Sequence, residues 1–332
     1  ALPIFRMDIN MPTAITQIAG RQVAAEKIPS WREIEEIWYP KHLSLEQCSS
    51  EITARYKARL FQGDSLTDLT GGFGIDCSFL ATGFKSATYV ERQEELCEIA
   101  AHNFPILNLN HINVRNEDGV AYLQTMSPVD CIFLDPARRN EHGGKTVAIS
   151  DCEPNVAELE ALLLSKANRV MIKLSPMLDL SLALKELKHT QEIHILSVNN
   201  ECKELLILLR QTSPAEIAIH CVNLLTKGTQ EEQHLVFTRE QEQRSQCTYT
   251  DSLGNYLYEP NASLLKAGAF RSIAAAYPVR KLHPNSHLYI SDSFIENFPG
   301  RIFRIVNQCS FNKKEVKENL ADLKKANVTV RN

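Results

Sequence analysis

The spacing of apolar residues changes twice along the chain and divides it into three regions. Up to about residue 60, apolar residues recur at helical spacing in EEIWYPK (35–41) and LSLEQCSSEITARYKARLF (43–61), which predicts a helical segment. From about residue 65, short apolar runs alternate with helical patterns, as expected for parallel strands joined by helices. The predicted strands of this region are 65–69, 87–91, 112–118, 129–135 and 169–175.

The pattern then departs from a simple parallel sheet. Residues 192–198 and 202–210 read as two strands joined at Asn199-Asn200, so we expect an antiparallel hairpin to close the sheet. From about Gly254 the order strand, helix, strand occurs twice, in YLYEPN, ASLLKAGAFRSIAAAY and SHLYISD and again in GRIFRIVNQCSF, NKKEVKENLADLKK and ANVTVRN. This order predicts one or two small α+β units of the ferredoxin-like kind.

These patterns predict three parts in an α/β protein. We expect a helical segment over 1–60, a doubly wound core over 61–225 and an α+β region over 226–332. Because the chain stops directly after a predicted strand, the last region is expected to be truncated.

Composition places the chain among soluble globular proteins. Of its 332 residues, 44% are hydrophobic and 23% charged, and no apolar run approaches the ~20 residues of a membrane span. The nine cysteines are scattered singly, without zinc-ligand spacing. We therefore expect a cytoplasmic protein with reduced cysteines, without a membrane segment and without a metal ion.

The net charge of −4 is unevenly distributed along the chain. From Pro260 to the end there are 12 Lys and Arg against 5 Asp and Glu, which leaves 24 against 35 in the rest of the chain. A basic C-terminal region favours contact with a polyanion. An ordinary solvated helix face over 313–325 explains the same charges, so both interpretations stay open.

Acidic residues end four successive predicted strands. Because the carboxyl ends of parallel strands lie on one rim, these four acids should face the same site. They are Asp68, Glu91, Asp118 and Asp135.

The turn after the first strand, DLTGGFGID (68–76), has glycines that allow a tight turn and close approach of a ligand. We expect Thr70, Gly72 and Gly74 to bind a cofactor there with Asp68. The dinucleotide fingerprint needs a third glycine, and that position is Cys77.

Each acid suits one part of an adenosine ligand that carries a positive end. Asp68 can accept from an ammonium group, and Glu91 from ribose hydroxyls. Asp118 can accept from the adenine amine, with the amide of Gly119 or Val120 near the ring. Asp135 completes the set, which favours S-adenosylmethionine over NAD because the acidic turn suits no pyrophosphate. The alternatives are a glycine turn with a capping Asp68, a surface Glu91 and a helix N-cap at Asp118.

The strand order and acids resemble class I S-adenosylmethionine-dependent methyltransferases, which have a Rossmann-like seven-stranded sheet. SSEITARYKARL, DLTGGFGID, FLDPARR and the C-terminal region further resemble a bacterial methyltransferase family with a THUMP-like C-terminal domain. The resemblance covers nearly the whole chain. It implies a tRNA or rRNA substrate, since THUMP-type domains are associated with tRNA.

The fourth strand ends in Asp135-Pro136-Ala137-Arg138, where amine-directed methyltransferases have Asp/Asn-Pro-Pro-aromatic. In them the acid accepts from the target amine and the ring stacks on the base. Asp135 and Pro136 match that motif, and Arg138 could stack on a base or pair with a phosphate. An internal ion pair of Arg138 and Arg139 with acids such as Glu153 is the alternative.

Two further features border this site in the sequence. A loop with Gly143 and Gly144 follows Asp135 as a candidate lid, and Lys173 ends the next strand, where it could pair with Asp135 or contact a phosphate.

The sequence therefore predicts an RNA methyltransferase in which Asp135 orients the nucleophile, Pro136 and Arg138 complete the catalytic motif, and the basic region binds RNA. Two alternatives stay open. One is a methyltransferase for a protein or small molecule. The other is a non-catalytic RNA-binding protein with a vestigial cofactor pocket.

Overall fold

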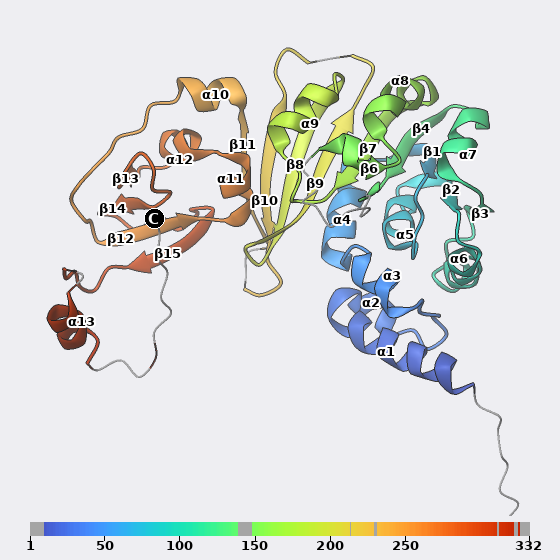
Figure 1. Cartoon of the computed structure of the whole chain (residues 1–332), viewed down its shortest axis with the longest axis horizontal. Coiled ribbons are helices and arrows are strands. Elements are labelled where there is room, and N and C mark those ends of the chain that lie inside the picture. Colours follow the sequence, from blue (N-terminus) through green and yellow to red (C-terminus); the bar gives the residue numbers. More distant parts are fainter. Residues whose placement is uncertain are drawn as a thin grey trace, which may run out of the picture. The chain divides into compact units, whose positions relative to one another are not determined.

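The structure of the chain is a computed structural model that describes residues 10–138, 148–212, 214–228, 231–310, 312–321 and 325 (Figure 1). The chain forms two compact units. The first comprises Ala1–Ile193 with Glu204–Ala215, and the second His194–Lys203 with Glu216–Asn332.

The strands of the main sheet that come from the first 209 residues lie in the order β8-β9-β7-β4-β1-β2-β3. Strands β1, β2, β3, β4 and β7 pair in parallel, whereas β9 is antiparallel to β7. Their bounds are β1 Gly63–Asp68, β2 Phe84–Glu91, β3 Ile112–Asn116, β4 Val129–Leu134, β7 Ala167–Leu174, β8 Thr190–Val198 and β9 Glu201–Leu209. The predicted turn between the last two strands is confirmed, because Asn199 and Asn200 both have positive φ, at 49° and 69°.

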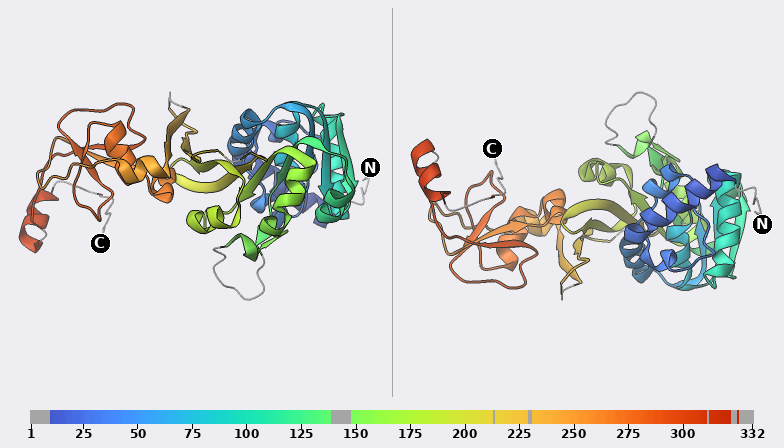
Figure 2. Two further views of the ribbon diagram at one scale, coloured as in Figure 1. Left: turned by 90° about the horizontal axis from the view of Figure 1, so that it is seen from above. Right: turned by 90° about the horizontal axis from the view of Figure 1, so that it is seen from below.

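Helices cover both faces of this sheet, as Figures 1 and 2 show. On one face α4 packs on α5, and on the other α7 packs on α8. The helices after the first strand are α5 Ile75–Ala81, α6 Glu94–Ile106, α7 Gly119–Thr125, α8 Val156–Lys166 and α9 Leu180–Glu186, with the short helix η1 Ile149–Asp151. A two-stranded ribbon, β5 Ala137–Arg138 and β6 Cys152–Glu153, lies beyond β4.

Four helices precede the sheet, α1 Met11–Lys27, α2 Pro29–Arg32, α3 His42–Gln47 and α4 Glu51–Leu60. The helix predicted for EEIWYPK is wrong, since residues 35–41 contain none. Side chains replace the helical hydrogen bonds there. Asn103 bonds the N–H and C=O of Trp38, and Gln17 does the same for Tyr39. The segment stays extended and buries Ile37 and Tyr39 in a core with Trp31 and Phe73.

The second unit contains a four-stranded antiparallel sheet in the order β13-β14-β12-β15. Its elements are β10 Ala218–Leu224, β11 Glu232–Thr238, α10 Arg239–Arg244, β12 Tyr256–Pro260, α11 Ala262–Ala267, α12 Phe270–Ala276, β13 Arg280–Lys281, β14 Tyr289–Ser291, β15 Gly300–Arg304 and α13 Lys313–Asn319. The single helix predicted for ASLLKAGAFRSIAAAY is two helices, because Gly268 ends α11 at a φ of 74°. The strand predicted for ANVTVRN lies outside the described residues.

The fold class predicted from the sequence is confirmed, with a mainly parallel sheet flanked by helices and a separate α+β module. Among the described residues, no helix is long and apolar enough to cross a membrane.

Candidate active site

The predicted acids gather at the carboxyl ends of the parallel strands, all within the first unit. Asp68 is the last residue of β1 and Glu91 the last residue of β2. Asp118 is the N-cap of α7, two residues after β3, and Asp135 directly follows β4. The parallel pairing of these strands brings the four acids to one rim of the sheet.

The glycine turn between β1 and α5 is held by Glu91. Gly72 and Gly74 have φ values of 53° and 85°, which L side chains rarely adopt. The amide of Gly72 donates to Oε2 of Glu91 at 2.9 Å, and the amide of Gln93 donates to Oε1 at 2.8 Å. Glu91 therefore fixes the turn through one oxygen, while each of its oxygens keeps a second lone pair for a ligand.

Asp118 and Gly119 start α7 against the end of β1. Oδ1 of Asp118 accepts from the amides of Val120 and Ala121, both at 3.0 Å, so the N-cap alternative is observed. A Cβ added to Gly119 would lie 2.1 Å from the carbonyl oxygen of Leu69, which only glycine avoids. The start of α7 thus lies directly beside the cofactor turn.

Asp68 carries a buried oxygen that no group of the described residues satisfies. Its side chain is 1% exposed, and Oδ1 accepts from the amide of Thr70 at 3.0 Å. Oδ2 is buried without a hydrogen-bond partner among the described residues. Burial raises the pKa of Asp68 well above its usual value, and the charges of Asp76, Asp135 and Glu91 raise it further.

Asp135 is more accessible than the other carboxylates in contact with the two lysines of this site. Its side chain keeps 37% of its surface exposed, whereas Asp76 keeps 10% and Glu204 9%. Its amide donates to Oγ1 of Thr70 at 2.6 Å, which ties the end of β4 to the turn after β1.

The residues after Pro136 form a ribbon, with Ala137 opposite Glu153 and Arg138 opposite Cys152. The side chain of Arg138, Arg139 and the candidate lid glycines lie outside the described residues.

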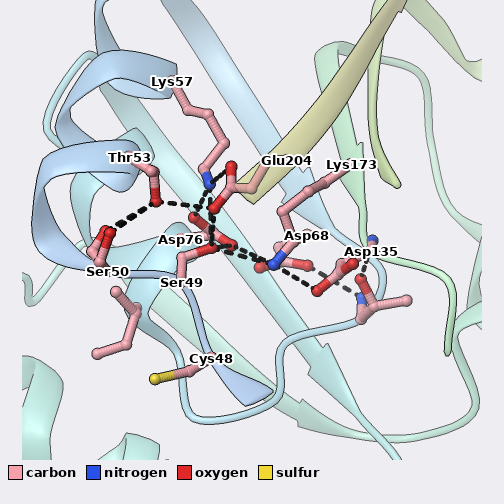
Figure 3. Close-up of polar contacts among 12 residues, drawn as sticks. Cys48, Ser49, Ser50, Thr53, Lys57, Asp68, Asp76, Asp135, Lys173 and Glu204 are labelled. Carbon is pink, nitrogen blue, oxygen red and sulfur yellow. Dashed lines mark hydrogen bonds and ion pairs between the residues drawn. The ribbon is translucent and has the colours of Figure 1, made fainter. Parts of the chain in front are cut away.

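Lys173 enters the site from β7 and pairs with Asp135. Its Nζ lies 2.6 Å from Oδ2 of Asp135 and 3.4 Å from Oδ2 of Asp76, and it donates to Oγ of Ser49 at 3.0 Å. Figure 3 shows these contacts converging on the ammonium group. The predicted pairing of Lys173 with Asp135 is confirmed.

A second buried lysine, Lys57 of α4, extends the network on the side away from Asp135 (Figure 3). Its side chain is fully buried, 3.0 Å from Oδ1 of Asp76, and also contacts Glu204. Oγ of Ser49 accepts from Lys57 at 3.0 Å, and Oγ1 of Thr53 donates to Oε1 of Glu204 at 2.7 Å. Asp76 therefore joins the two lysines.

The two ammonium groups determine the charge of this network. Burial opposes ionisation of Asp76, but Lys57 and Lys173 outweigh it and lower the pKa of Asp76 to about 2. Burial also opposes the charge of Lys173, and Asp135, Asp76 and Glu204 together raise its pKa well above the usual value. Burial raises the pKa of Asp135, while Lys173 opposes that rise. Lys173 is thus held protonated.

Sequence reasoning missed most of this network, namely Ser49, Thr53, Lys57, Asp76 and Glu204. Asp76 stands within the glycine-turn motif, but its position in the first turn of α5 suggested no partner. Glu204 interrupts the apolar strand CKELLILLR, and this is the one signal that could have marked it. Their contacts join α4, α5 and β9, which local patterns do not connect.

The residues of the rim fit S-adenosylmethionine. The unsatisfied Oδ2 of Asp68 suits the ammonium group of the amino-acid portion. Glu91 borders a turn where glycines at positive φ admit a ligand to the backbone. A mainly parallel sheet with this acidic rim is typical of Rossmann-like methyltransferases.

Comparison with known proteins identifies the family. The structure superposes on the crystal structure of a candidate methyltransferase from Porphyromonas gingivalis W83 with a TM-score of 0.85 and 37% identity, over 95% of this chain and 80% of that one. The profile of a ferredoxin-like domain matches residues 256–299. The chain belongs to the family of the Porphyromonas protein. The prediction of a methyltransferase that uses S-adenosylmethionine is confirmed.

Other solved structures are more distant. A modification subunit of a type I restriction enzyme from Vibrio vulnificus YJ016 gives a TM-score of 0.41 at 12% identity, over 60% of this chain and 56% of that one. TrmK of M. capricolum, in complex with S-adenosylhomocysteine, gives 0.38 at 12% identity over 48% and 68%. At this level the comparisons carry no argument about activity. No curated protein matches the chain.

Proposed function

We propose that the protein transfers a methyl group from S-adenosylmethionine to RNA, with Asp135 holding the acceptor atom. One observation carries the proposal. Asp135 combines an exposed edge with a fixed backbone, because Thr70 accepts from its amide and Lys173 pairs with its carboxylate. It stands on the rim that carries the unsatisfied carboxylate of Asp68.

Each rim residue has a proposed part in holding the cofactor. Asp68 accepts from the ammonium group, and Glu91 accepts from the ribose hydroxyls through its remaining lone pairs. Asp118 and the amide of Gly119 face the adenine. Thr70, Gly72 and Gly74 form the turn that lets the ligand approach the backbone.

The chemistry requires alignment more than strong acid–base assistance. When bound, S-adenosylmethionine supplies an electrophilic methyl group on a sulfonium. Asp135 holds the acceptor by a hydrogen bond and receives its proton. Pro136 restricts the backbone after Asp135, and Arg138 is proposed to contact the substrate from the ribbon that follows.

The second unit supplies a surface suited to RNA. Some of its basic residues are used internally, since Arg280 pairs with Asp292 at 2.9 Å and Lys281 is 3% exposed. Others are exposed, among them Arg304 and the α13 residues Lys313, Lys314 and Lys317. In β15 the ring of Phe303 is 43% exposed, and the guanidinium of Arg301 lies 5.6 Å from its centroid. Exposed cations and an exposed aromatic ring suit a single-stranded nucleic acid.

The decisive experiment transfers labelled methyl groups from S-adenosylmethionine to total RNA of a bacterial strain that lacks the gene. We expect labelled RNA with the wild-type protein and none with Asp135→Ala. Label confined to protein or metabolite fractions of the same extract would replace the RNA proposal by one of the alternative substrates. S-Adenosylhomocysteine binding that persists in Asp135→Ala shows that the variant is folded.

The RNA contact has a test of its own. Replacing Lys313, Lys314 and Lys317 by Ala removes three exposed charges, so the slope of log affinity against log salt concentration should fall by about 2. The matched control replaces Lys41 and Lys85, two exposed lysines of the first unit that pair with Glu95 and Asp64. Equal slopes in all three proteins would remove α13 from the RNA surface.

A further inference from the structure

Lys173 places a fixed positive charge beside the position of the methyl acceptor. Its Nζ lies 2.6 Å from Oδ2 of Asp135, and its side chain is 8% exposed. A substrate atom that hydrogen-bonds to Asp135 then lies about 3–5 Å from the ammonium group. At that distance, with little intervening water, the charge acts directly on the reacting atom.

The charge affects the two common kinds of acceptor in opposite directions. An amine that attacks a methyl group gains positive charge on nitrogen, which a neighbouring ammonium group destabilises. A hydroxyl that loses its proton gains negative charge on oxygen, which the same ammonium group stabilises.

The surrounding network keeps this charge in place. Lys173 donates to Oγ of Ser49 at 3.0 Å, pairs with Oδ2 of Asp135 at 2.6 Å and lies 3.4 Å from Oδ2 of Asp76, so polar oxygens surround the ammonium group. Asp76 is in turn fixed by Lys57, and Glu204 completes the pairing of Lys57. These carboxylates raise the pKa of Lys173 well above its usual value against the effect of burial, so it is a fixed cation and not the base.

The segment after Asp135 lacks the parts that hold a planar base amine. Ala137 and Arg138 stand where amine-directed enzymes have a second proline and an aromatic ring. Both residues pair with the strand Cys152–Glu153. Neither Ala137 nor Arg138 carries an aromatic ring that could stack on a base.

We infer that the acceptor is a hydroxyl oxygen, the ribose 2′-hydroxyl of RNA, and that Lys173 positions Asp135 and stabilises the oxygen as it loses its proton. The inference rests on the proposed function and names its substrate group. The 2′-hydroxyl occurs on every nucleotide and is exposed in single strands.

The step balances with the groups named. The hydroxyl oxygen forms a bond to the methyl carbon, and the carbon–sulfur bond of S-adenosylmethionine breaks with its electron pair remaining on sulfur. The hydroxyl proton passes to the carboxylate of Asp135 and from there to water. Lys173 stays protonated throughout.

The product identifies the acceptor directly. RNA labelled by the wild-type protein is digested to nucleosides, and we expect the label in 2′-O-methylated nucleosides. Alkaline digestion should leave labelled dinucleotides, because strand cleavage needs a free 2′-hydroxyl. Label in base-methylated nucleosides overturns this inference and leaves the proposed function standing. Unlabelled RNA overturns both.

Variants test the part of Lys173. In Lys173→Met we expect kcat to fall about 10²–10³-fold, the usual effect of removing one stabilising group. The acidic limb of the pH–rate profile should move to higher pH because Asp135 loses its cation. Lys173→Arg keeps the charge and should restore part of kcat and the wild-type limb. Binding of S-adenosylhomocysteine, measured by calorimetry, should change less than about 3-fold in both variants.

The matched control is Lys166→Met, at the last residue of α8 directly before β7, where Nζ donates to the carbonyl of Met126. It should leave kcat and the pH profile unchanged. Because Asp76 and Glu204 also face the network, a purely structural role would lower thermal stability without moving the acidic limb. If the acidic limb of the pH–rate profile does not move in a folded Lys173→Met variant, the proposed action of Lys173 on Asp135 is overturned.

Discussion

The hydroxyl of Thr70 accepts a hydrogen bond of 2.6 Å from the amide of Asp135. The amide of Thr70 in turn donates to Oδ1 of Asp68 at 3.0 Å. One residue of the cofactor turn therefore joins the acid proposed to bind the cofactor to the acid proposed to hold the substrate. The methyl donor and the methyl acceptor are therefore proposed to be positioned by the same short turn after β1.

Replacing Thr70 by Val should affect transfer more than stability. The amide of Asp135 loses its acceptor, so the free energy of unfolding should fall by about 1 kcal/mol, as for a typical hydrogen bond. Because Asp135 is then less well placed, we expect the rate of labelled methyl transfer to fall more than about 10-fold. Urea unfolding and the transfer assay measure the two effects. Thr82→Val, which removes a bond to Phe79 in an exposed helix turn, is the control. A variant with wild-type transfer would contradict this relationship.

Replacing Lys57 by Met should be one of the most destabilising single changes in the first unit. It leaves Asp76 and Glu204 buried without their shared cation, and breaking a buried pair typically costs about 3–5 kcal/mol. The free energy of unfolding in urea measures the loss.

The control is Lys41→Met, which breaks an ion pair with Glu95. The side chains of Lys41 and Glu95 are 75% and 55% exposed. This change should cost about 0–1 kcal/mol. Adding Glu204→Gln to Lys57→Met should recover part of the stability because one buried charge is removed. Equal losses in Lys57→Met and Lys41→Met would show that the buried network contributes no more than a surface pair.

Much of the fold was predictable because its signals are local. Apolar strands alternating with helices place Asp68, Glu91 and Asp135 at strand ends, and the Asn199-Asn200 pair marks a tight turn. Where prediction failed, distant side chains decided the outcome. Residues 35–41 have apolar residues compatible with a helix, yet amides from α1 and α6 hold them extended.

The buried network was beyond local prediction for the same reason. Lys57 of α4 and Glu204 of β9 are 147 residues apart in sequence and meet only in the folded chain. A charged residue inside an apolar strand indicates that a partner exists, but the sequence does not say which residue it is. The pairing of Lys173 with Asp135 was predictable because both residues end strands of one parallel sheet.

Asp68→Asn should separate cofactor binding from folding. In the folded protein the pKa of Asp68 is raised, chiefly by burial. The protonated carboxyl of Asp68 therefore contributes stability in full below the unfolded pKa of about 3.9, and this contribution is lost as pH rises through the folded pKa. The variant should therefore be at least as stable as the wild type at alkaline pH.

Cofactor binding should strengthen as pH rises, whereas the stability contributed by Asp68 falls. An ammonium group on the ligand favours ionised Asp68, so S-adenosylhomocysteine should release a proton on binding to the wild type and bind more tightly as pH rises. Calorimetry in two buffers of different ionisation enthalpy counts the protons. Asp68→Asn should bind at least about 10-fold more weakly and release fewer protons. Asp64→Asn, at the other end of β1, is the control. Undiminished binding in Asp68→Asn would remove this acid from the cofactor site.

Asp76→Asn should produce a stability loss that depends on pH in a defined direction. Lys57 and Lys173 outweigh the effect of burial and lower the pKa of Asp76 to about 2. A lowered folded pKa contributes stability above the unfolded value, and this contribution is lost as pH falls through the folded one. The free energy of unfolding of the wild type should exceed that of the variant by about 2 kcal/mol at pH 7. This difference should shrink between about pH 4 and pH 2. In the Lys57→Met background the pKa of Asp76 rises, so the gap should be smaller and should close at higher pH. Urea unfolding at a series of pH values measures both gaps. A gap that is constant with pH would mean that Asp76 stabilises the fold by packing and hydrogen bonding, and that its charge is not what holds the two lysines together.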